Sequence, residues 1–235
     1  MDVMVSPVFS TQLEGLAFLQ AGRRRLLTAD ADAEFIMRSR DEVLASFGPM
    51  FRERAERISE EDVARFLDFE HNCHWTGLHR QKSAILSNMP AVRKAVIRLM
   101  RRHGDDGDLE ERFNFACETV RGFGEGIITP ILFVAYPQHY GVWNSKSEFA
   151  LKMLGLWIVQ DRGESKGRSY CKVNATLLQA RNFLNRHLCA GEHPIDLWSI
   201  DYCWHAIKVM HDDGRLQPLI QELRPQMDQL LANLA

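Results

Sequence analysis

The fold of this chain is indicated most clearly by residues 121–156, which read RGFGEGIITPILFVAYPQHYGVWNSKSEFALKMLGL. Gly122 and Gly124 flank a phenylalanine, and both are expected in a tight turn that uses a positive φ. The apolar run that follows has the spacing of a buried helix, and Asn144 stands where the next helix opens. The segment predicts a helix ending near Val120, a turn, and a helix whose first backbone N–H groups form an anion site.

Helical periodicity also dominates the rest of the sequence. Ser59 followed by Asp62 has the pattern of a capping box, and Pro90 stands in a first-turn position. The alternation typical of strands is nearly absent. Further helices are expected over residues 59–75, 90–103, 109–120, 174–188, 197–210 and from 216 to the end. The sequence therefore predicts an all-α protein.

Composition limits the classes of function. The 235 residues carry a net charge of −2, but basic residues cluster at 23–25, 52–57, 93–102 and 162–172, which permits a nucleic-acid surface without requiring one. The five cysteines are scattered without a C-x-x-C motif, so no disulfide framework, metal site or cofactor is expected. No secretion signal and no apolar run near the roughly 20 residues of a membrane span is evident, and a cytoplasmic protein without membrane contact is expected.

The arrangement of helix, Gly-Phe-Gly turn, helix, loop and polar helix-opening residue resembles the helix-hairpin-helix DNA glycosylases. The turn matches at 122–124, VWN at 142–144 stands where that family has a Val-Asp pair, and SEFALKMLGL at 147–156 looks like the helix that follows. The resemblance implies a helix-hairpin-helix glycosylase-like fold of two closely joined helical lobes. It also implies one domain over residues 1–235, with an N-terminal helical region at 1–58 and the hairpin-containing core at 59–235.

Two departures from this family affect the expected chemistry. Asn144 takes the place of the catalytic Asp, and an amide can orient a water but cannot take its proton. Gly126 takes the place of the lysine of the bifunctional members, so Schiff-base chemistry from that position is excluded. The carboxylate would then come from Glu148, one turn beyond Asn144, or from Glu125 or Asp201. The expected catalytic set is Asn144, Glu148 and Asp201.

Residues 66–80, 129–144 and 161–174 carry a second resemblance, to modules associated with prokaryotic restriction and anti-phage systems. Within the first of these segments, Asn72 and His74 offer hydrogen bonds to a flipped base, and Trp75 offers a stacking surface. Tyr140 is placed with Asn144 at the mouth of this base pocket. In the alternative interpretation, Trp75 and the loop at 136–143 are simply core, the histidines cap a helix end, and Asn144 is only a helix cap.

The expected DNA-backbone contacts are of two kinds. The turn would use the backbone around Gly122, Phe123, Gly124 and Gly126, and cationic side chains would add phosphate contacts. The glycine-punctuated stretch at 161–172 is interpreted as an exposed basic loop, although a charge run is often only a solvated surface. The cations chosen for DNA contact are Arg80, Lys146, Arg168 and Lys172.

The resulting hypothesis is a monofunctional DNA glycosylase that needs no cofactor. It would flip and excise a modified base from double-stranded DNA, such as a modified cytosine of phage DNA, and leave an abasic site in anti-phage defence. The alternative is a non-catalytic module that binds modified DNA and recruits an effector. The sequence specifies neither the base nor the oligomeric state.

Overall fold

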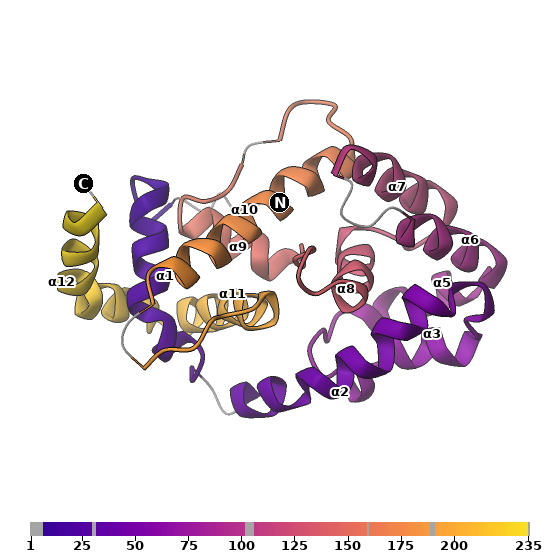
Figure 1. The fold of residues 1–235 in the computed structure, drawn as a ribbon, viewed down its shortest axis with the longest axis horizontal. Coiled ribbons are helices and arrows are strands. Elements are labelled where there is room, and N and C mark those ends of the chain that lie inside the picture. Colours follow the sequence, from indigo (N-terminus) through magenta and orange to yellow (C-terminus); the bar gives the residue numbers. More distant parts are fainter. Residues whose placement is uncertain (1–6, 30–31, 102–105, 159, 189–190, 235) are drawn as a thin grey trace. The chain divides into compact units, whose positions relative to one another are not determined.

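The computed structural model describes residues 7–29, 32–101, 106–158, 160–188 and 191–234. The regular secondary structure of these residues consists of helices, which turns and loops connect, and no strand occurs among them. This confirms the predicted all-α class (Figure 1). Contacts between Cα atoms divide the chain into two compact units. The first comprises Met1–Glu34, Asn144–Val159 and Ala175–Ala235, and the second comprises Phe35–Trp143 and Gln160–Asn174.

The first unit is a helical bundle in which α1 packs against α12 and α11 packs against α9. A Cβ placed on Gly15 of α1 would lie 2.1 Å from the Leu154 carbonyl oxygen, so glycine permits this close backbone approach. The helices of this unit are α1 (Gln12–Leu26), α9 (Ser145–Met153), the later part of α10 (Lys166–Arg186), α11 (Leu197–Asp212) and α12 (Leu216–Leu234).

The second unit contains the hairpin segment and an aromatic core. Phe66 packs edge-on against Phe47 and Phe51, with ring centroids 5.2 and 4.9 Å apart. In Figure 1, α6 and α7 lie side by side. The elements are α2 (Asp32–Glu53), η1 (Ala55–Arg57), α3 (Glu60–Leu67), α4 (Phe69–Asn72), η2 (Leu78–Gln81), α5 (Lys82–Leu86), α6 (Met89–Met100), α7 (Asp106–Thr119), α8 (Glu125–Ala135) and the first part of α10.

Local capping signals predicted several helix starts correctly. Ser59 and Asp62 form the capping box of α3, and Pro90 lies in the first turn of α6. The predicted continuous helix over 59–75 is wrong, because Asp68 adopts an extended conformation between α3 and α4. The predicted loop at 161–172 is also wrong in its second half, because α10 begins at Lys166 and continues through Gly167.

Candidate nucleic-acid interface

The hairpin between α7 and α8 requires glycine at one position for two reasons. Gly122 has a φ of 95°, which residues other than glycine rarely adopt. A Cβ at this position would also lie 3.2 Å from both Gln81 Oε1 and Ile85 Cγ1. Phe123 is buried beside this turn. The turn therefore lies against η2 and α5, and the predicted use of a positive φ is confirmed at Gly122.

Gly124 differs from the prediction. Its φ of −138° and ψ of −174° are extended, so no positive φ is needed there. Gly124 is the N-cap of α8 and supplies no side-chain cap to the first N–H groups of that helix. A Cβ at Gly124 or at Gly126 would meet no atom within 4 Å. These two glycines leave open space beside the start of α8, where an anion can approach the backbone.

Three cationic residues lie on the segments that meet at the hairpin. Arg121 immediately precedes Gly122, and Arg80 immediately precedes Gln81, which contacts the turn. Both arginines are exposed, and within the described part of the chain neither guanidinium is paired with a carboxylate. Lys166 Nζ lies 2.5 Å from Glu125 Oε2 in the first turn of α8. Among the described residues, two arginines without a carboxylate partner and one paired lysine thus lie on the hairpin or on the segments that meet it.

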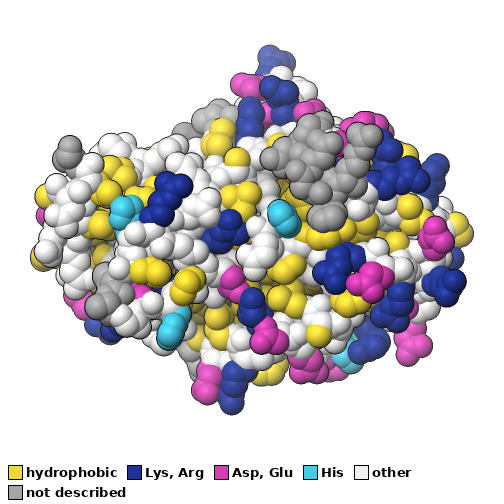
Figure 2. All heavy atoms as spheres, in the orientation of Figure 1, with side chains coloured by type: hydrophobic (Ala, Val, Ile, Leu, Met, Phe, Trp, Pro, Cys, Tyr) yellow, Lys and Arg dark blue, Asp and Glu magenta, His cyan; other side chains and the backbone are white. Residues whose placement is uncertain are grey.

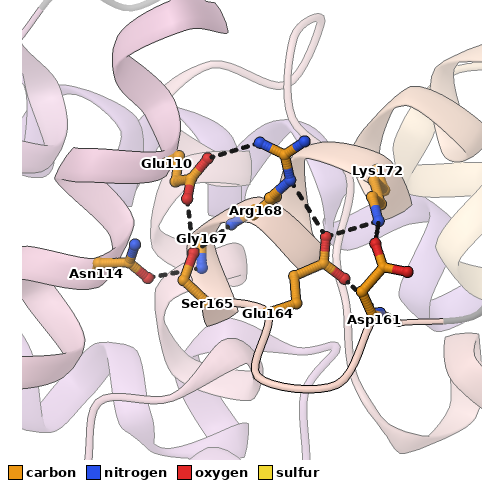
Figure 3. A network of polar contacts seen from close by, with 8 residues as sticks. All are labelled: Glu110, Asn114, Asp161, Glu164, Ser165, Gly167, Arg168 and Lys172. Carbon is orange, nitrogen blue, oxygen red and sulfur yellow. Dashed lines mark hydrogen bonds and ion pairs between the residues drawn. The ribbon is translucent and has the colours of Figure 1, made fainter.

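The cations predicted to follow DNA at 161–172 are largely held in an ion-pair network (Figure 3). Lys172 Nζ lies 2.7 Å from Glu164 Oε1 and 3.0 Å from Asp161 Oδ2. Arg168 lies 3.6 Å from Glu164 and 3.9 Å from Glu110. Lysine donation lowers the pKa of Glu164, so this carboxyl group stays charged at neutral pH. On the face seen in Figure 2, acidic side chains likewise lie among the lysines and arginines.

Asn144 caps α9, as the alternative interpretation predicted. Its Oδ1 accepts hydrogen bonds from the backbone N–H groups of Lys146 (2.9 Å) and Ser147 (3.0 Å), and Ser147 Oγ accepts from the Asn144 N–H group. This capping box fixes the orientation of the Asn144 carboxamide. The amide oxygen is committed to the cap, so Nδ2, a hydrogen-bond donor, is the group left to face a ligand.

The predicted catalytic carboxylates also lie in the first unit. Glu148 Oε1 is held 2.6 Å from Lys152 Nζ, one turn along α9. Asp201 lies on α11 and is 6% exposed. The sequence did not reveal a contact between α9 and α11, in which Lys146 Nζ lies 2.7 Å from His205 Nδ1. No local pattern pointed to this contact, because Lys146 and His205 are 59 residues apart in the sequence.

The residues predicted to form a base pocket are enclosed by the second unit. Asn72 is fully buried, and its Nδ2 donates to the backbone oxygens of Phe66 (3.1 Å) and Asp68 (3.0 Å). Its Oδ1 accepts from the N–H groups of His74 (3.0 Å) and Trp75 (2.7 Å). Trp75 is 5% exposed. These contacts favour the alternative interpretation, in which this segment is core.

The Trp75 ring lies edge-on to Phe133 at 5.8 Å and is tilted against Phe66 at 6.2 Å. His74, which is 9% exposed, lies edge-on to Trp75 at 5.1 Å. Three aromatic contacts thus surround the indole, whereas a base-stacking surface must leave one face of the ring open to the ligand.

Tyr140 belongs to a loop that buried polar side chains hold in place. Asn174 Oδ1 accepts from the Gly141 N–H group (2.7 Å), and Asn174 Nδ2 donates to the His139 carbonyl oxygen (2.9 Å). The Tyr170 hydroxyl donates to the Gly141 carbonyl oxygen at 2.8 Å. Tyr140 itself is 1% exposed. Sequence reasoning missed Asn174 and Tyr170, because both are distant in sequence from the loop that they hold.

Replacement of Asn174 with alanine should destabilise the protein. The variant leaves the Gly141 N–H group and the His139 carbonyl oxygen without their partner in a buried setting, at a cost of about 2–3 kcal/mol. Urea unfolding measures the change. Gln179→Ala, at an exposed position of the same helix, is the control for a general helix effect, and equal loss in both variants would contradict the assigned role of Asn174.

The described cysteines are free thiols; Cys203 is buried, and Cys117 is partly buried. Burial raises the pKa of Cys117 to about 11 and that of Cys203 to about 12. These two thiols are therefore protonated at neutral pH and unsuited to nucleophilic chemistry. Within the described ranges, no group of three or more His, Cys, Asp or Glu residues is arranged to hold a metal.

Among the helices of the described residues, none is long and apolar enough to cross a bilayer.

Searches against family models, curated proteins and solved structures find no match to this chain.

Proposed function

We propose that this chain binds double-stranded DNA through the hairpin between α7 and α8 and excises a modified base as a DNA glycosylase. The observation that carries the proposal is the geometry of the hairpin. Gly122 holds a left-handed turn, while Gly124 and Gly126 leave open space at the start of α8. A phosphate placed there would meet backbone N–H groups at the positive end of a helix dipole.

The unpaired cations at the hairpin support the same proposal. Arg121 adjoins Gly122 in the chain and Arg80 adjoins Gln81, and both are exposed, so each could neutralise a further phosphate of the backbone. Such contacts position a duplex but do not read its sequence. The modified base would be read elsewhere, after it is flipped out of the stack. The proposed setting is anti-phage defence in the cytoplasm.

Excision would be hydrolytic. The bond between the sugar C1′ and the base nitrogen breaks, a water oxygen bonds to C1′, and the departing base takes a proton. In this proposal the Asn144 amide group orients the water or the sugar, and Glu148, released from Lys152, supplies the negative charge. No lysine stands at position 126, so the product should be an intact abasic strand, and borohydride should trap no protein–DNA adduct.

The test is incubation of the protein with duplexes carrying phage-type modified bases, followed by alkali to cleave abasic sites. Wild-type protein should give alkali-dependent strand breaks. Asn144→Ala should slow base release at least tenfold without abolishing DNA binding, because it removes the orienting amide group; it should also cost about 1 kcal/mol as a lost helix cap. Asn144→Asp keeps the cap and restores the family's charge, so it should retain or exceed the wild-type rate.

Control measurements separate the cap from the chemistry. Thermal unfolding measures the stability lost with the helix cap, and binding titrations measure the affinity for the duplex. If both Asn144 variants release base at the wild-type rate, Asn144 does not lie in the active site. If the wild-type protein releases no base from any modified duplex that it binds, the enzymatic proposal is wrong.

A second function, that of a non-catalytic reader of modified DNA, is favoured by one observation. The amide of Asn144 cannot take a proton, and Glu148 is paired with Lys152 at 2.6 Å, so neither residue is placed to act as a base in the described conformation. A reader would bind modified duplex more tightly than unmodified duplex and leave no abasic site. The same titration and alkali assay distinguish the two functions.

A further inference from the structure

The hairpin carries an ion pair between an exposed lysine and a half-buried glutamate. Lys166, in the first turn of α10, and Glu125, in the first turn of α8, meet at 2.5 Å between Nζ and Oε2. Their side chains are 58% and 34% exposed. An exposed pair of this kind contributes little to stability and can exchange partners readily. The Lys166 ammonium group is therefore available to another anion at the same place.

The other two cations of this region each have two carboxylate partners, whereas Lys166 pairs with Glu125. Lys172 has two carboxylate partners, and one of them, Glu164, has a side chain only 2% exposed (Figure 3). Arg168 likewise lies between Glu110 and Glu164. Each of these cations therefore has two carboxylate partners, one of which is the buried Glu164, although the Arg168 side chain itself is 62% exposed. Lys166 is different, because its partner Glu125 is itself a hairpin residue.

The backbone that carries Lys166 is rigidly placed. The Gly167 N–H group donates to Asn114 Oδ1 at 2.8 Å, and the Ser165 hydroxyl donates to Glu110 Oε1 at 2.8 Å. These bonds attach the start of α10 to α7. Exchange of partners at Lys166 then requires only side-chain rotation, without movement of the helix. Cys117 lies near the pair and adds no charge, because its thiol is protonated.

We propose that Glu125 restrains DNA binding by occupying Lys166, and that a backbone phosphate of the duplex displaces it. This inference rests on the proposed DNA-binding function and identifies Glu125 as the residue that limits the affinity for DNA. The displaced carboxylate also remains close to the phosphate and repels it. The net affinity for DNA is therefore lower than the hairpin cations alone would give.

The test compares four folded proteins by fluorescence anisotropy with a short duplex at several salt concentrations. Glu125→Gln should bind about threefold more tightly than wild type, a factor in the range of one exposed ion pair. The plot of log affinity against log salt should steepen by up to about 1, as for one added phosphate contact. The double variant Glu125→Gln/Lys166→Gln should lose this gain. Glu111→Gln is the matched control, since Glu111 lies on α7 and pairs with Arg98 at 2.5 Å.

The outcomes separate this inference from the function on which it rests. Equal affinities of wild type and Glu125→Gln would overturn the restraint and leave DNA binding standing. An equal gain in Glu111→Gln would also overturn it, because the effect would then be one of net charge. If none of the four proteins binds DNA while all give native melting curves, the proposed function fails and the restraint fails with it.

Discussion

Gly167→Ala is expected to destabilise the protein by about 3 kcal/mol or more, or to prevent folding. A Cβ at this position would lie 2.2 Å from the Glu110 carbonyl oxygen and 2.9 Å from the carbonyl carbon of the same residue. Both atoms belong to the backbone of α7, so the clash cannot be relieved by a side-chain rotation. The start of α10 would have to move away from α7, with loss of the hydrogen bond to Asn114. Chemical denaturation measures the loss.

Gly126→Ala is the matched control for this variant. It also replaces a helical glycine of the second unit, but a Cβ there would meet no atom within 4 Å. Alanine should therefore stabilise α8 by roughly 0.5–1 kcal/mol, since it restricts the unfolded chain and favours helix. If the free energy of unfolding of Gly167→Ala lies within about 1 kcal/mol of the wild-type value, the backbones of α7 and α10 do not approach each other at Gly167.

Trp75→Ala is expected to cost about 3–5 kcal/mol of stability, as large aromatic deletions in cores do. The indole is 5% exposed and packs between Phe66 and Phe133. Its backbone N–H group is also fixed by Asn72. Truncation would leave a cavity at the centre of the aromatic core of the second unit. The free energy of unfolding measures this effect, and duplex affinity is measured at a temperature at which the variant is folded.

Trp75→Phe is the conservative comparison, because it keeps an aromatic ring in the core. If Trp75 is a core residue, stability should fall strongly in the alanine variant and much less in the phenylalanine variant. Selectivity for modified over unmodified DNA should remain in both. A normal stability in Trp75→Ala with lost base selectivity would instead support the base-pocket interpretation and contradict the structural one.

Local signals made much of the fold predictable. Capping patterns act within one helical turn, so Ser59 with Asp62 and the cap at Asn144 could be recognised from the sequence alone. The helical spacing of apolar residues predicted the positions of most helices, and Gly122 and Gly124 predicted the position of the turn. The conformation of each glycine was less predictable: Gly122 needs a positive φ, whereas Gly124 is extended and instead leaves open space.

Long-range contacts account for what the sequence did not reveal. Gly167 suggested a loop, because glycine is common in loops. In the structure this glycine instead allows the backbone of Glu110, a residue far away in the sequence, to approach α10 closely. Lys172 suggested a free cation, because its carboxylate partners are known only once the chain is folded. Polar and aromatic residues near Trp75 suggested a ligand pocket, and burial decides between a pocket and a core. Local spacing cannot supply that information.

The most direct test of the proposed DNA contact is the duplex affinity of Gly124→Val. Its extended backbone accepts valine, and a Cβ there meets no atom within 4 Å, so the variant should fold with at most a weakened N-cap. The added side chain would cover the first N–H groups of α8. If the hairpin binds a phosphate, affinity should fall about tenfold or more while the melting curve stays close to wild type. Wild-type affinity in this folded variant would contradict a phosphate contact at the start of α8.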